Sequence, residues 1–392
     1  MGFKNSFRQL VMPLTTAGLL AVAGFVQAED TLKIGLVAAL SGQSAKSGEA
    51  ITRGLTIAID EINTNGGILG QQVELLARDD ESNPNKGLLA ARELVQKEKV
   101  AVLFGGLDTP VSLAIVPLAN RMEFPFMGVW AAGTPITQNG AEKNYVFRVS
   151  AVDALVDEAL VQYGIDKYDM KNPGMVLINN PWGESNEKGF RKALESRDMT
   201  WAGIERVEGN DTDMVPQLSR LKAAGADSLL MVANVAPSAQ VVKSLDRMGW
   251  DVPIISHWGP AGGRFSELAG ENAHKVHFIQ TFTFDENQEG KGADVLAALK
   301  KRYPEIQDLA DITPAVGIAN AYDAMHLTAI AIENAGSTDG SAIRQGYYDI
   351  ESYSGLIKTY DKPFSAQQHD AIAPEDYVFT HFVDGRIVPL PQ

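Results

Sequence analysis

The sequence predicts an α/β protein with two doubly wound lobes, each built on a parallel sheet. Three observations favour this fold class. Short apolar runs alternate with stretches of helical periodicity, which is typical of βαβ units and parallel sheets. The same rhythm begins twice along the chain, near residue 32 and again near residue 175. The 392 residues also leave room for two domains of roughly 100–200 residues each.

The first 28 residues have the pattern of a secretory signal peptide. Lys4 and Arg8 give a positive start, residues 10–26 are mostly apolar, and Val26-Gln27-Ala28 forms a small-residue cleavage site. A membrane anchor is the alternative, but a spanning helix needs about 20 clearly apolar residues, and Pro13 interrupts this run. We therefore expect cleavage after Ala28 and a mature protein in the periplasm.

The first lobe begins at residue 32 and alternates strands with helices. Ile51, Leu55 and Ile62 fall on one face of a helix that Asn65-Gly66-Gly67 ends. Apolar residues between 88 and 95 mark a second helix. The compact apolar runs predict four strands, at 32–40, 73–77, 100–104 and 125–129.

The second lobe repeats this order without repeating the sequence of the first. Its predicted strands are 175–178, 228–232 and 252–255. No Pro-rich or Ser-rich linker separates the lobes, so we expect short crossings between them. We also expect no stretch after the signal segment to be long and apolar enough to span a bilayer.

Composition excludes several classes of function. The chain has no cysteine, which excludes disulfides, thiolate nucleophiles and cysteine-based zinc sites. Its formal net charge is −15, whereas nucleic-acid binding needs clustered Lys and Arg. The chain contains no G-x-S-x-G elbow or P-loop, and no G-x-G-x-x-G follows its first strand. We therefore expect no nucleic-acid partner, no cofactor or metal, and no enzyme activity.

Asp79-Asp80-Glu81 follows the second predicted strand and precedes Asn83-Pro84. A calcium loop is one interpretation of this acidic run, but the glycine and the spacing of an EF-hand loop are missing. We expect instead a turn that caps the next helix.

Small and polar residues follow three strands of the first lobe, at loops 41–44, 107–109 and 131–134. In open α/β sheets, ligands bind beyond the carboxyl ends of the strands. Small residues let backbone N–H groups approach a ligand, and helices that begin there favour an anion. One such loop alone is more often a tight turn, but three at one edge favour a binding site. Its candidate residues are Asp108, Thr109, Ala131, Ala132, Gly133 and Thr134.

The second lobe places aromatic and polar residues at its own strand ends. Trp182 follows its first strand, Asn234 follows another, and His257-Trp258 follows a third. Aromatic residues at such positions indicate a pocket or a lobe interface, with core packing as the competing interpretation for the two tryptophans.

Several short motifs occur in a specific order and spacing across residues 31–390. They are Ala39-Leu40-Ser41-Gly42 with Gly48, Ile59-Asp60-Glu61-Ile62-Asn63 with Gly66-Gly67, Trp182-Gly183, residues 221–227 and Ala321-Tyr322-Asp323-Ala324. With these motifs the chain resembles the type I periplasmic solute-binding proteins of ABC importers, of the leucine/isoleucine/valine-binding kind. The resemblance implies two lobes joined by three crossovers that close on a ligand. The implied lobes are 29–149 plus 281–353 and 150–280 plus 354–392.

The resemblance also implies roles for the candidate residues. In that family a hydroxyl after the third strand and N–H groups after the fourth bind the ligand carboxylate, which points to Thr109 and to loop 131–133, with Thr134 adjacent. Trp182 occupies the place of an aromatic residue that closes over the ligand. The acid that usually binds the α-ammonium falls at about His257-Trp258, where this chain has no carboxylate.

The missing acid leaves two ligand classes open. A buried ammonium without an anionic partner costs several kcal/mol, more than the ~1.5–3 kcal/mol gained by burying one apolar side chain. A site without the acid should therefore favour carboxylates that lack an amine, such as benzoate-like or aryl-alkanoic acids packed by Trp182 and Trp258. Asp108 keeps both ligand classes open, because it could bind an ammonium or a ligand hydroxyl. His257 could likewise contact the polar far end of the ligand.

These inferences together predict a monomeric periplasmic receptor. It captures a small carboxylate, either a hydrophobic amino acid or an aromatic acid, and delivers it to an inner-membrane ABC permease. Two other functions stay open at this point. One is a ligand-sensing domain that passes lobe closure to a signalling partner, and the other is an exported hydrolase on a related fold.

Overall fold

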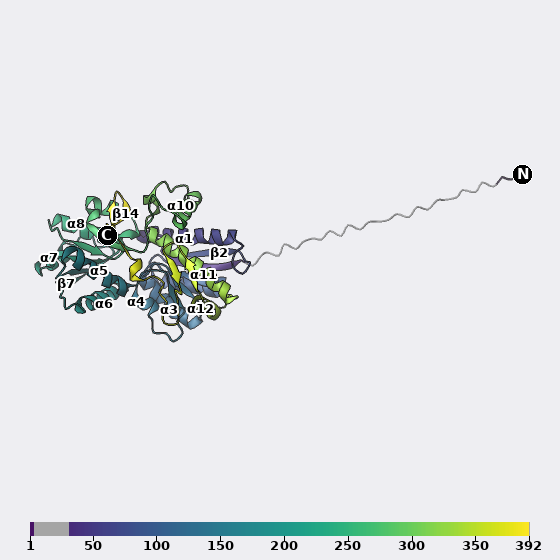
Figure 1. Ribbon diagram of the computed structural model, residues 1–392, viewed down its shortest axis with the longest axis horizontal. Coiled ribbons are helices and arrows are strands. Elements are labelled where there is room, and N and C mark those ends of the chain that lie inside the picture. The colour runs from purple at the N-terminus through teal and green to yellow at the C-terminus, as the bar shows by residue number, and fades with distance from the viewer. Residues whose placement is uncertain (4–30, 392) are drawn as a thin grey trace.

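The first lobe is built on a parallel sheet of five strands in the order β2-β1-β3-β4-β5. A computed structural model describes residues 1–3 and 31–391, and in it two lobes lie side by side (Figure 1). The predicted signal peptide and its cleavage site therefore lie almost entirely outside the described residues. The strands are β1 (Leu32–Ala38), β2 (Val73–Asp79), β3 (Val102–Gly105), β4 (Phe126–Gly128) and β5 (Val146–Arg148).

Helices cover both faces of this sheet, with α2 against α3 and with α11 against α1 and α12. Asn83 caps α2 by accepting bonds from Asn85 N and Lys86 N, so the cap lies after the acidic run and not within it. The helices are α1 (Ala45–Thr64), α2 (Pro84–Glu93), α3 (Thr109–Met122), α4 (Thr134–Thr137), α10 (Lys291–Arg302), α11 (Ala315–Ala335) and α12 (Gly340–Tyr348).

The second lobe has a seven-stranded sheet in the order β14-β13-β10-β9-β8-β6-β7. Five strands are parallel, while β13 and β14 add an antiparallel edge that the sequence did not predict. The strands are β6 (Gly174–Ile178), β7 (Gly203–Val207), β8 (Leu229–Val232), β9 (Ile254–Ser256), β10 (Val276–Gln280), β13 (Val378–Val383) and β14 (Arg386–Pro389). Its helices are α5 (Asp153–Tyr168), α6 (Pro181–Glu195), α7 (Val215–Ala223), α8 (Val235–Arg247) and α9 (Phe265–Ala269).

The predicted fold class, two doubly wound α/β lobes, is confirmed. The parallel strands of both lobes have the same order, because β7-β6-β8-β9-β10 repeats β2-β1-β3-β4-β5. In this order the connections reverse direction beside the first strand of each lobe, and ligands bind at such switch points.

The chain crosses between the lobes three times, and the third crossing lies later than predicted. The first two crossings are short segments after β5 and β10. The third was expected at residue 354, but β11 (Ser352–Ser354) and β12 (Thr359–Asp361) form a hairpin on the first lobe. There the Tyr360 hydroxyl donates to Asp323 at 2.8 Å, and Asp370 pairs with Arg148 at 2.7 Å. The crossing therefore falls between Asp370 and β13.

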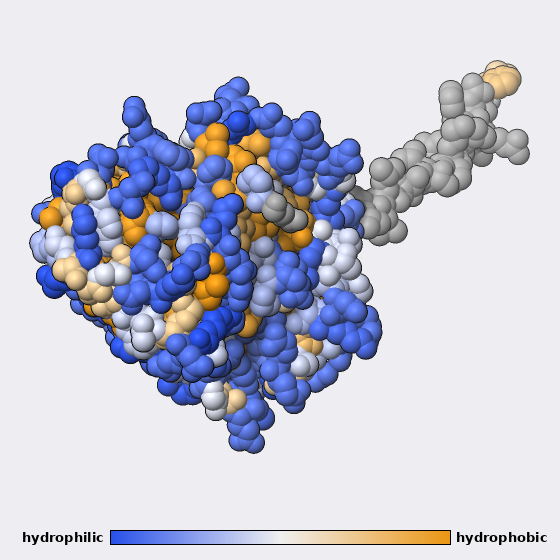
Figure 2. Space-filling model, turned by 60° about the vertical axis from the view of Figure 1, so that its left-hand side comes forward, coloured by the Kyte–Doolittle hydropathy of each residue, from blue (hydrophilic) through white to orange (hydrophobic). Residues whose placement is uncertain are grey.

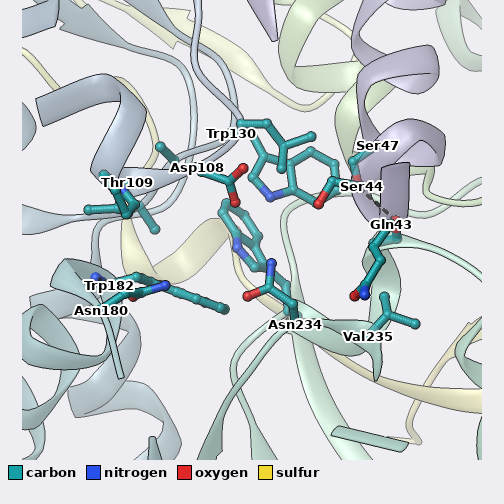
Figure 3. Close-up of a pocket in the computed structure, with 17 residues that line it drawn as sticks. Gln43, Ser44, Ser47, Asp108, Thr109, Trp130, Asn180, Trp182, Asn234 and Val235 are labelled. Atoms are coloured by element: carbon teal, nitrogen blue, oxygen red, sulfur yellow. Dashed lines mark hydrogen bonds between the residues drawn. The ribbon is translucent and has the colours of Figure 1, made fainter. Parts of the chain in front are cut away.

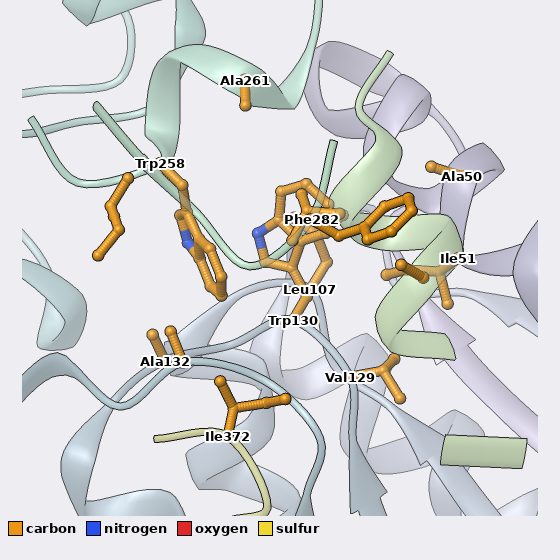
Figure 4. Packing of buried hydrophobic residues seen from close by; sticks show 14 of the residues in the cluster. Ala50, Ile51, Leu107, Val129, Trp130, Ala132, Trp258, Ala261, Phe282 and Ile372 are labelled. Carbon is orange, nitrogen blue, oxygen red and sulfur yellow. The ribbon is translucent and has the colours of Figure 1, made fainter. Parts of the chain in front are cut away.

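One hydrophobic cluster spans both lobes, which are closed on each other. Figure 4 shows Trp130 of the first lobe beside Trp258 of the second, with ring centroids 5.7 Å apart. The Ser47 hydroxyl donates to Gly262 O at 2.8 Å across the same interface. A second contact runs from Thr134 N to the Ser185 hydroxyl at 3.1 Å.

Helix α11 is long and apolar enough to cross a membrane by length and composition, contrary to our expectation from the sequence. In its most apolar window 78% of the residues are buried inside the protein, because the helix packs between α1 and α12. Its apolar character is therefore that of a core helix.

Figure 2 shows a largely hydrophilic face on which hydrophobic residues gather in a hollow.

Candidate ligand-binding cleft

The candidate site is a cleft between the lobes, at the carboxyl ends of both sheets (Figure 3). Equivalent strands of the two lobes contribute to it. In the first lobe its residues follow β1, β3 and β4, and in the second they follow β6, β8 and β9. The polar and aromatic residues that line it are Gln43, Ser44, Ser47, Asp108, Thr109, Trp130, Asn180, Trp182, Asn234 and Trp258.

The walls of the cleft combine three indole rings with hydroxyl and amide groups. Asp108 is the one carboxyl among the described lining residues, which include neither Lys nor Arg. The closed lobes leave a cavity of about 40 Å³, and one water needs about 10–15 Å³ of such volume. There is room for a few water molecules, so a larger ligand enters only when the lobes move apart.

Thr109 presents its hydroxyl group at one end of the cleft. It is the first residue of α3 and is only 3% exposed. Its Oγ1 accepts a bond from Gly133 N at 3.3 Å, so the hydroxyl proton stays available for an acceptor in the cleft. The first turn of α3 adds its partial positive charge at the same place. Both features suit a carboxylate.

Hydrogen bonds from a buried arginine hold the 131–134 loop in place. Arg148 donates to Ala131 O at 3.2 Å and to Gly133 O at 2.9 Å, and Asp153 N donates to Ala132 O at 2.8 Å. All three carbonyls thus point away from the cleft. Ala131 N donates to Gly106 O. For Ala132 N, no acceptor is found in the described part of the chain, which leaves it as a donor for a ligand.

Replacing Thr109 with valine should weaken binding of a carboxylate ligand at least tenfold, or about 1.4 kcal/mol, because the hydroxyl donor is lost while the shape is kept. Isothermal titration of leucine or benzoate into both proteins measures the change. Replacing the exposed Thr64 with valine is the control, and equal affinities of the Thr109 variant and the natural protein would contradict the assignment.

Gly133 and Thr134 lie beside the cleft without lining it. A Cβ at Gly133 would lie 2.5 Å from Thr109 Cγ2, so a side chain there would displace Thr109. Thr134 uses its hydroxyl to accept a bond from Ala154 N at 3.0 Å, at the start of α5. This differs from the expectation that Thr134 contacts the ligand, because its side chain caps a helix.

Asp108 lies opposite Asn234, and Figure 3 shows its carboxyl directed into the cleft. It precedes α3 as the N-cap residue but makes no capping bond, so the start of that helix does not hold the carboxyl. Burial raises the pKa of this carboxyl, while hydrogen bonding to Ser82 and Asn234 lowers it in part. A cationic group in the cleft would favour its ionised form.

A second carboxyl lies behind Asp108. Asp80 is fully buried and accepts a bond from Ser82 N at 2.8 Å. Burial, with smaller contributions from Asp108 and Asp79, raises the pKa of Asp80 to about 7. A cation bound at this wall of the cleft would favour the ionised forms of both carboxyls.

The raised pKa of Asp80 predicts a stability that falls as pH rises. Between about pH 4 and 7 the folded chain retains a proton that the unfolded chain has released, so each pH unit removes up to ~1.4 kcal/mol. Asp80→Asn should therefore lose less stability than the natural protein between pH 5 and pH 8, as urea unfolding measures. Asp60→Asn, at an exposed site on α1, is the control, and parallel profiles for all three proteins would refute the expectation.

Trp182 and Trp258 line the second-lobe wall of the cleft, whereas His257 does not. The His257 ring is fully buried, with Nε2 3.1 Å from Asp153 Oδ1 and Nδ1 accepting a bond from Trp258 N at 2.8 Å. This placement differs from the expectation that His257 contacts the far end of the ligand. Adjacent residues at a strand end point to opposite sides, so only Trp258 faces the cleft.

Sequence reasoning missed several lining residues. Trp130 directly precedes the 131–134 loop and packs at a tilt against Trp258, while Ser47 lies in the first turn of α1 and Asn180 caps α6. Gln43 and Ser44 belong to loop 41–44, which the sequence indicates as a strand end, but the predicted site residues include neither of them. Among the described residues, no group of three or more His, Cys, Asp or Glu side chains is placed to bind a metal ion.

Comparison with known proteins agrees with this architecture. A family model described as "Periplasmic binding protein" matches residues 31–385. The Leu/Ile/Val-binding protein homolog 3 of Brucella melitensis is 26% identical over 382 residues, which cover 96% of this chain and 98% of that protein.

Two solved structures share the fold, each with a TM-score of 0.78. One is a branched-chain amino acid transporter substrate-binding protein of Streptococcus pneumoniae in complex with isoleucine, 23% identical and covering 91% of this chain and 97% of that one. The other is a solute-binding protein of an ABC transporter from R. palustris in complex with 4-hydroxybenzoate, 21% identical and covering 92% and 96%.

Proposed function

This chain belongs to the periplasmic binding protein family, and on that premise we propose that it is the solute-binding component of an ABC importer. It captures a hydrophobic amino acid between its lobes and delivers it to an inner-membrane permease. Lobe closure is the signal, and no bond of the ligand is made or broken.

This proposal rests on the presence of hydrogen-bond donors and a carboxyl in one cleft. The Thr109 hydroxyl and Ala132 N offer donors to a carboxylate, while Asp108 offers an anion to an ammonium. The described lining residues include neither Lys nor Arg, so no cationic side chain among them opposes an ammonium. An α-amino acid carries its ammonium and its carboxylate on the same carbon and fits this arrangement.

A second candidate ligand is an aromatic acid without an amine, which the three indole rings favour. Trp130, Trp182 and Trp258 surround the cleft, and aromatic rings pack well against each other at centroid distances of about 4.5–7 Å. In this case the protonated form of Asp108, which its raised pKa favours, donates to a ligand hydroxyl. The R. palustris protein in complex with 4-hydroxybenzoate has the same fold.

The remaining parts of the proposal concern location and assembly. The family is periplasmic, and we propose that residues 1–28 direct export and are removed after Ala28. We propose that the mature protein is a monomer. Mass spectrometry of the protein purified from the periplasm tests the cleavage site, and its elution volume tests the monomer.

A thermal-shift panel tests the ligand class. It compares leucine, isoleucine and phenylalanine with 4-methylpentanoate, benzoate and 4-hydroxybenzoate. A ligand at 100 times its dissociation constant stabilises the folded protein by ~2.7 kcal/mol, which raises the melting temperature measurably. Shifts with amino acids alone support the main proposal, and shifts with aromatic acids alone support the second candidate. If no acid in the panel shifts the melting temperature, both are wrong.

A further inference from the structure

Two of the three tryptophans of the cleft are connected to one buried carboxyl. We propose that Asp153 is a positioning residue, which orients Trp182 directly and Trp258 through His257, and joins this wall to the 131–134 loop of the first lobe. The inference rests on the proposed function, because it assigns a role in ligand binding to a residue that does not line the cleft.

The direct bonds converge on one oxygen. Asp153 is fully buried at the start of α5, and its Oδ1 accepts bonds from Trp182 Nε1 at 3.2 Å and from His257 Nε2 at 3.1 Å. An indole N–H is only a donor, so Trp182 needs an acceptor at this place. Asp153 therefore fixes the rotation of the ring that closes one side of the cleft.

The hydrogen-bond pattern also determines the tautomer of His257. Trp258 N donates to Nδ1 at 2.8 Å, so Nδ1 carries the lone pair and the proton is on Nε2, where it is donated to Asp153. The rings of Trp182, His257 and Trp258 pack one against the next, with His257 in the middle. The His257 ring lies edge to face with Trp182 at 76° and with Trp258 at 65°, with both centroid distances 5.2 Å.

The backbone of the same residue is bonded to the other lobe. Asp153 N donates to Ala132 O at 2.8 Å, and the next N–H, of Ala154, donates to the Thr134 hydroxyl at 3.0 Å. These bonds attach the start of α5 to the loop that we propose binds the carboxylate. One residue beside the first crossing thus connects the two walls of the cleft.

The test compares three variants that keep the number and branching of the side-chain heavy atoms. Asp153→Leu removes the acceptor, and Asp153→Asn keeps an oxygen where Oδ1 lies. Asp157→Leu is the matched control. Asp157 lies one turn further along α5, is equally buried, and neither of its oxygens has a partner among the described residues. The affinity for leucine or, if the panel selects it, for benzoate is measured by isothermal titration.

We expect Asp153→Leu to weaken binding at least tenfold, and Asp153→Asn and Asp157→Leu to stay within threefold of the natural protein. Equal losses in Asp153→Leu and Asp157→Leu would show a merely structural role and overturn the proposal. Unchanged binding in Asp153→Leu would overturn it as well.

A measurement without ligand keeps the proposal falsifiable if Asp153→Leu does not fold. Nitrogen-15 NMR of the natural protein should show His257 as the neutral tautomer protonated at Nε2. A ring protonated at Nδ1, or at both nitrogens, would overturn the proposal. This result does not depend on the panel, so failure of the proposed function and failure of the Asp153 assignment are distinguishable.

Discussion

Replacing Asp108 with asparagine should weaken leucine binding at least 100-fold. The variant keeps the shape of the side chain but removes the one carboxyl among the described lining residues, so the ligand ammonium is buried without an anion. Truncating one partner of a buried, hydrogen-bonded charge pair costs about 2–5 kcal/mol, and 100-fold corresponds to about 2.7 kcal/mol. Isothermal titration at pH 7 and at two salt concentrations measures the loss.

The control for this variant is a ligand rather than a second mutation. 4-Methylpentanoate is leucine without its amine, so it makes the same apolar contacts and brings the same carboxylate to Thr109. Its affinity should be unchanged or improved in Asp108→Asn, because a buried carboxyl no longer faces an apolar group. Leucine affinity equal to that of the natural protein would show that Asp108 does not bind the ammonium.

Replacing Arg148 with methionine should destabilise the protein by about 3–5 kcal/mol. The guanidinium is fully buried, pairs with Asp370 at 2.7 Å, and bonds two carbonyls of the 131–134 loop and the Thr137 hydroxyl. Its removal leaves Asp370 as a buried charge without a counter-ion, and such an unpaired charge strongly lowers the free energy of unfolding. Urea unfolding at pH 7 measures the change in the free energy of unfolding.

Arg220 provides the matched control. It bonds both oxygens of Glu205, but its side chain is 60% exposed, so Arg220→Met should change the free energy of unfolding far less than Arg148→Met does. Adding Asp370→Asn to Arg148→Met should recover part of the loss, because the unpaired charge is then removed as well. A loss below 1 kcal/mol in Arg148→Met would mean that water or another group compensates Asp370.

The sequence predicted the features that depend on local pattern. The β1 strand follows from a compact apolar run and the α1 helix from helical periodicity, and the strand-end rule placed Thr109 and Trp182 at one cleft. Other features depend on contacts between distant residues. The antiparallel edge of β13 and β14 and the late third crossing arise because segments after residue 354 pack on partners far away in sequence.

The errors at the site have a common physical cause. His257 and Trp258 are adjacent, yet one is buried behind the wall and the other lines it, and only the direction of each side chain at the strand end distinguishes them. Asp153 lies 104 residues before His257, so no local spacing could indicate their bond. Thr134 has a hydroxyl of the expected type, but the start of α5 provides it with another partner.

A crystal structure of the protein with the tightest-binding acid of the panel tests the central claim most directly. We predict a ligand enclosed between the lobes, with its carboxylate accepting bonds from the Thr109 hydroxyl and Ala132 N, and with its amine or hydroxyl against Asp108. A ligand bound outside the cleft would contradict this account of the site, and so would a carboxylate turned toward Asn234.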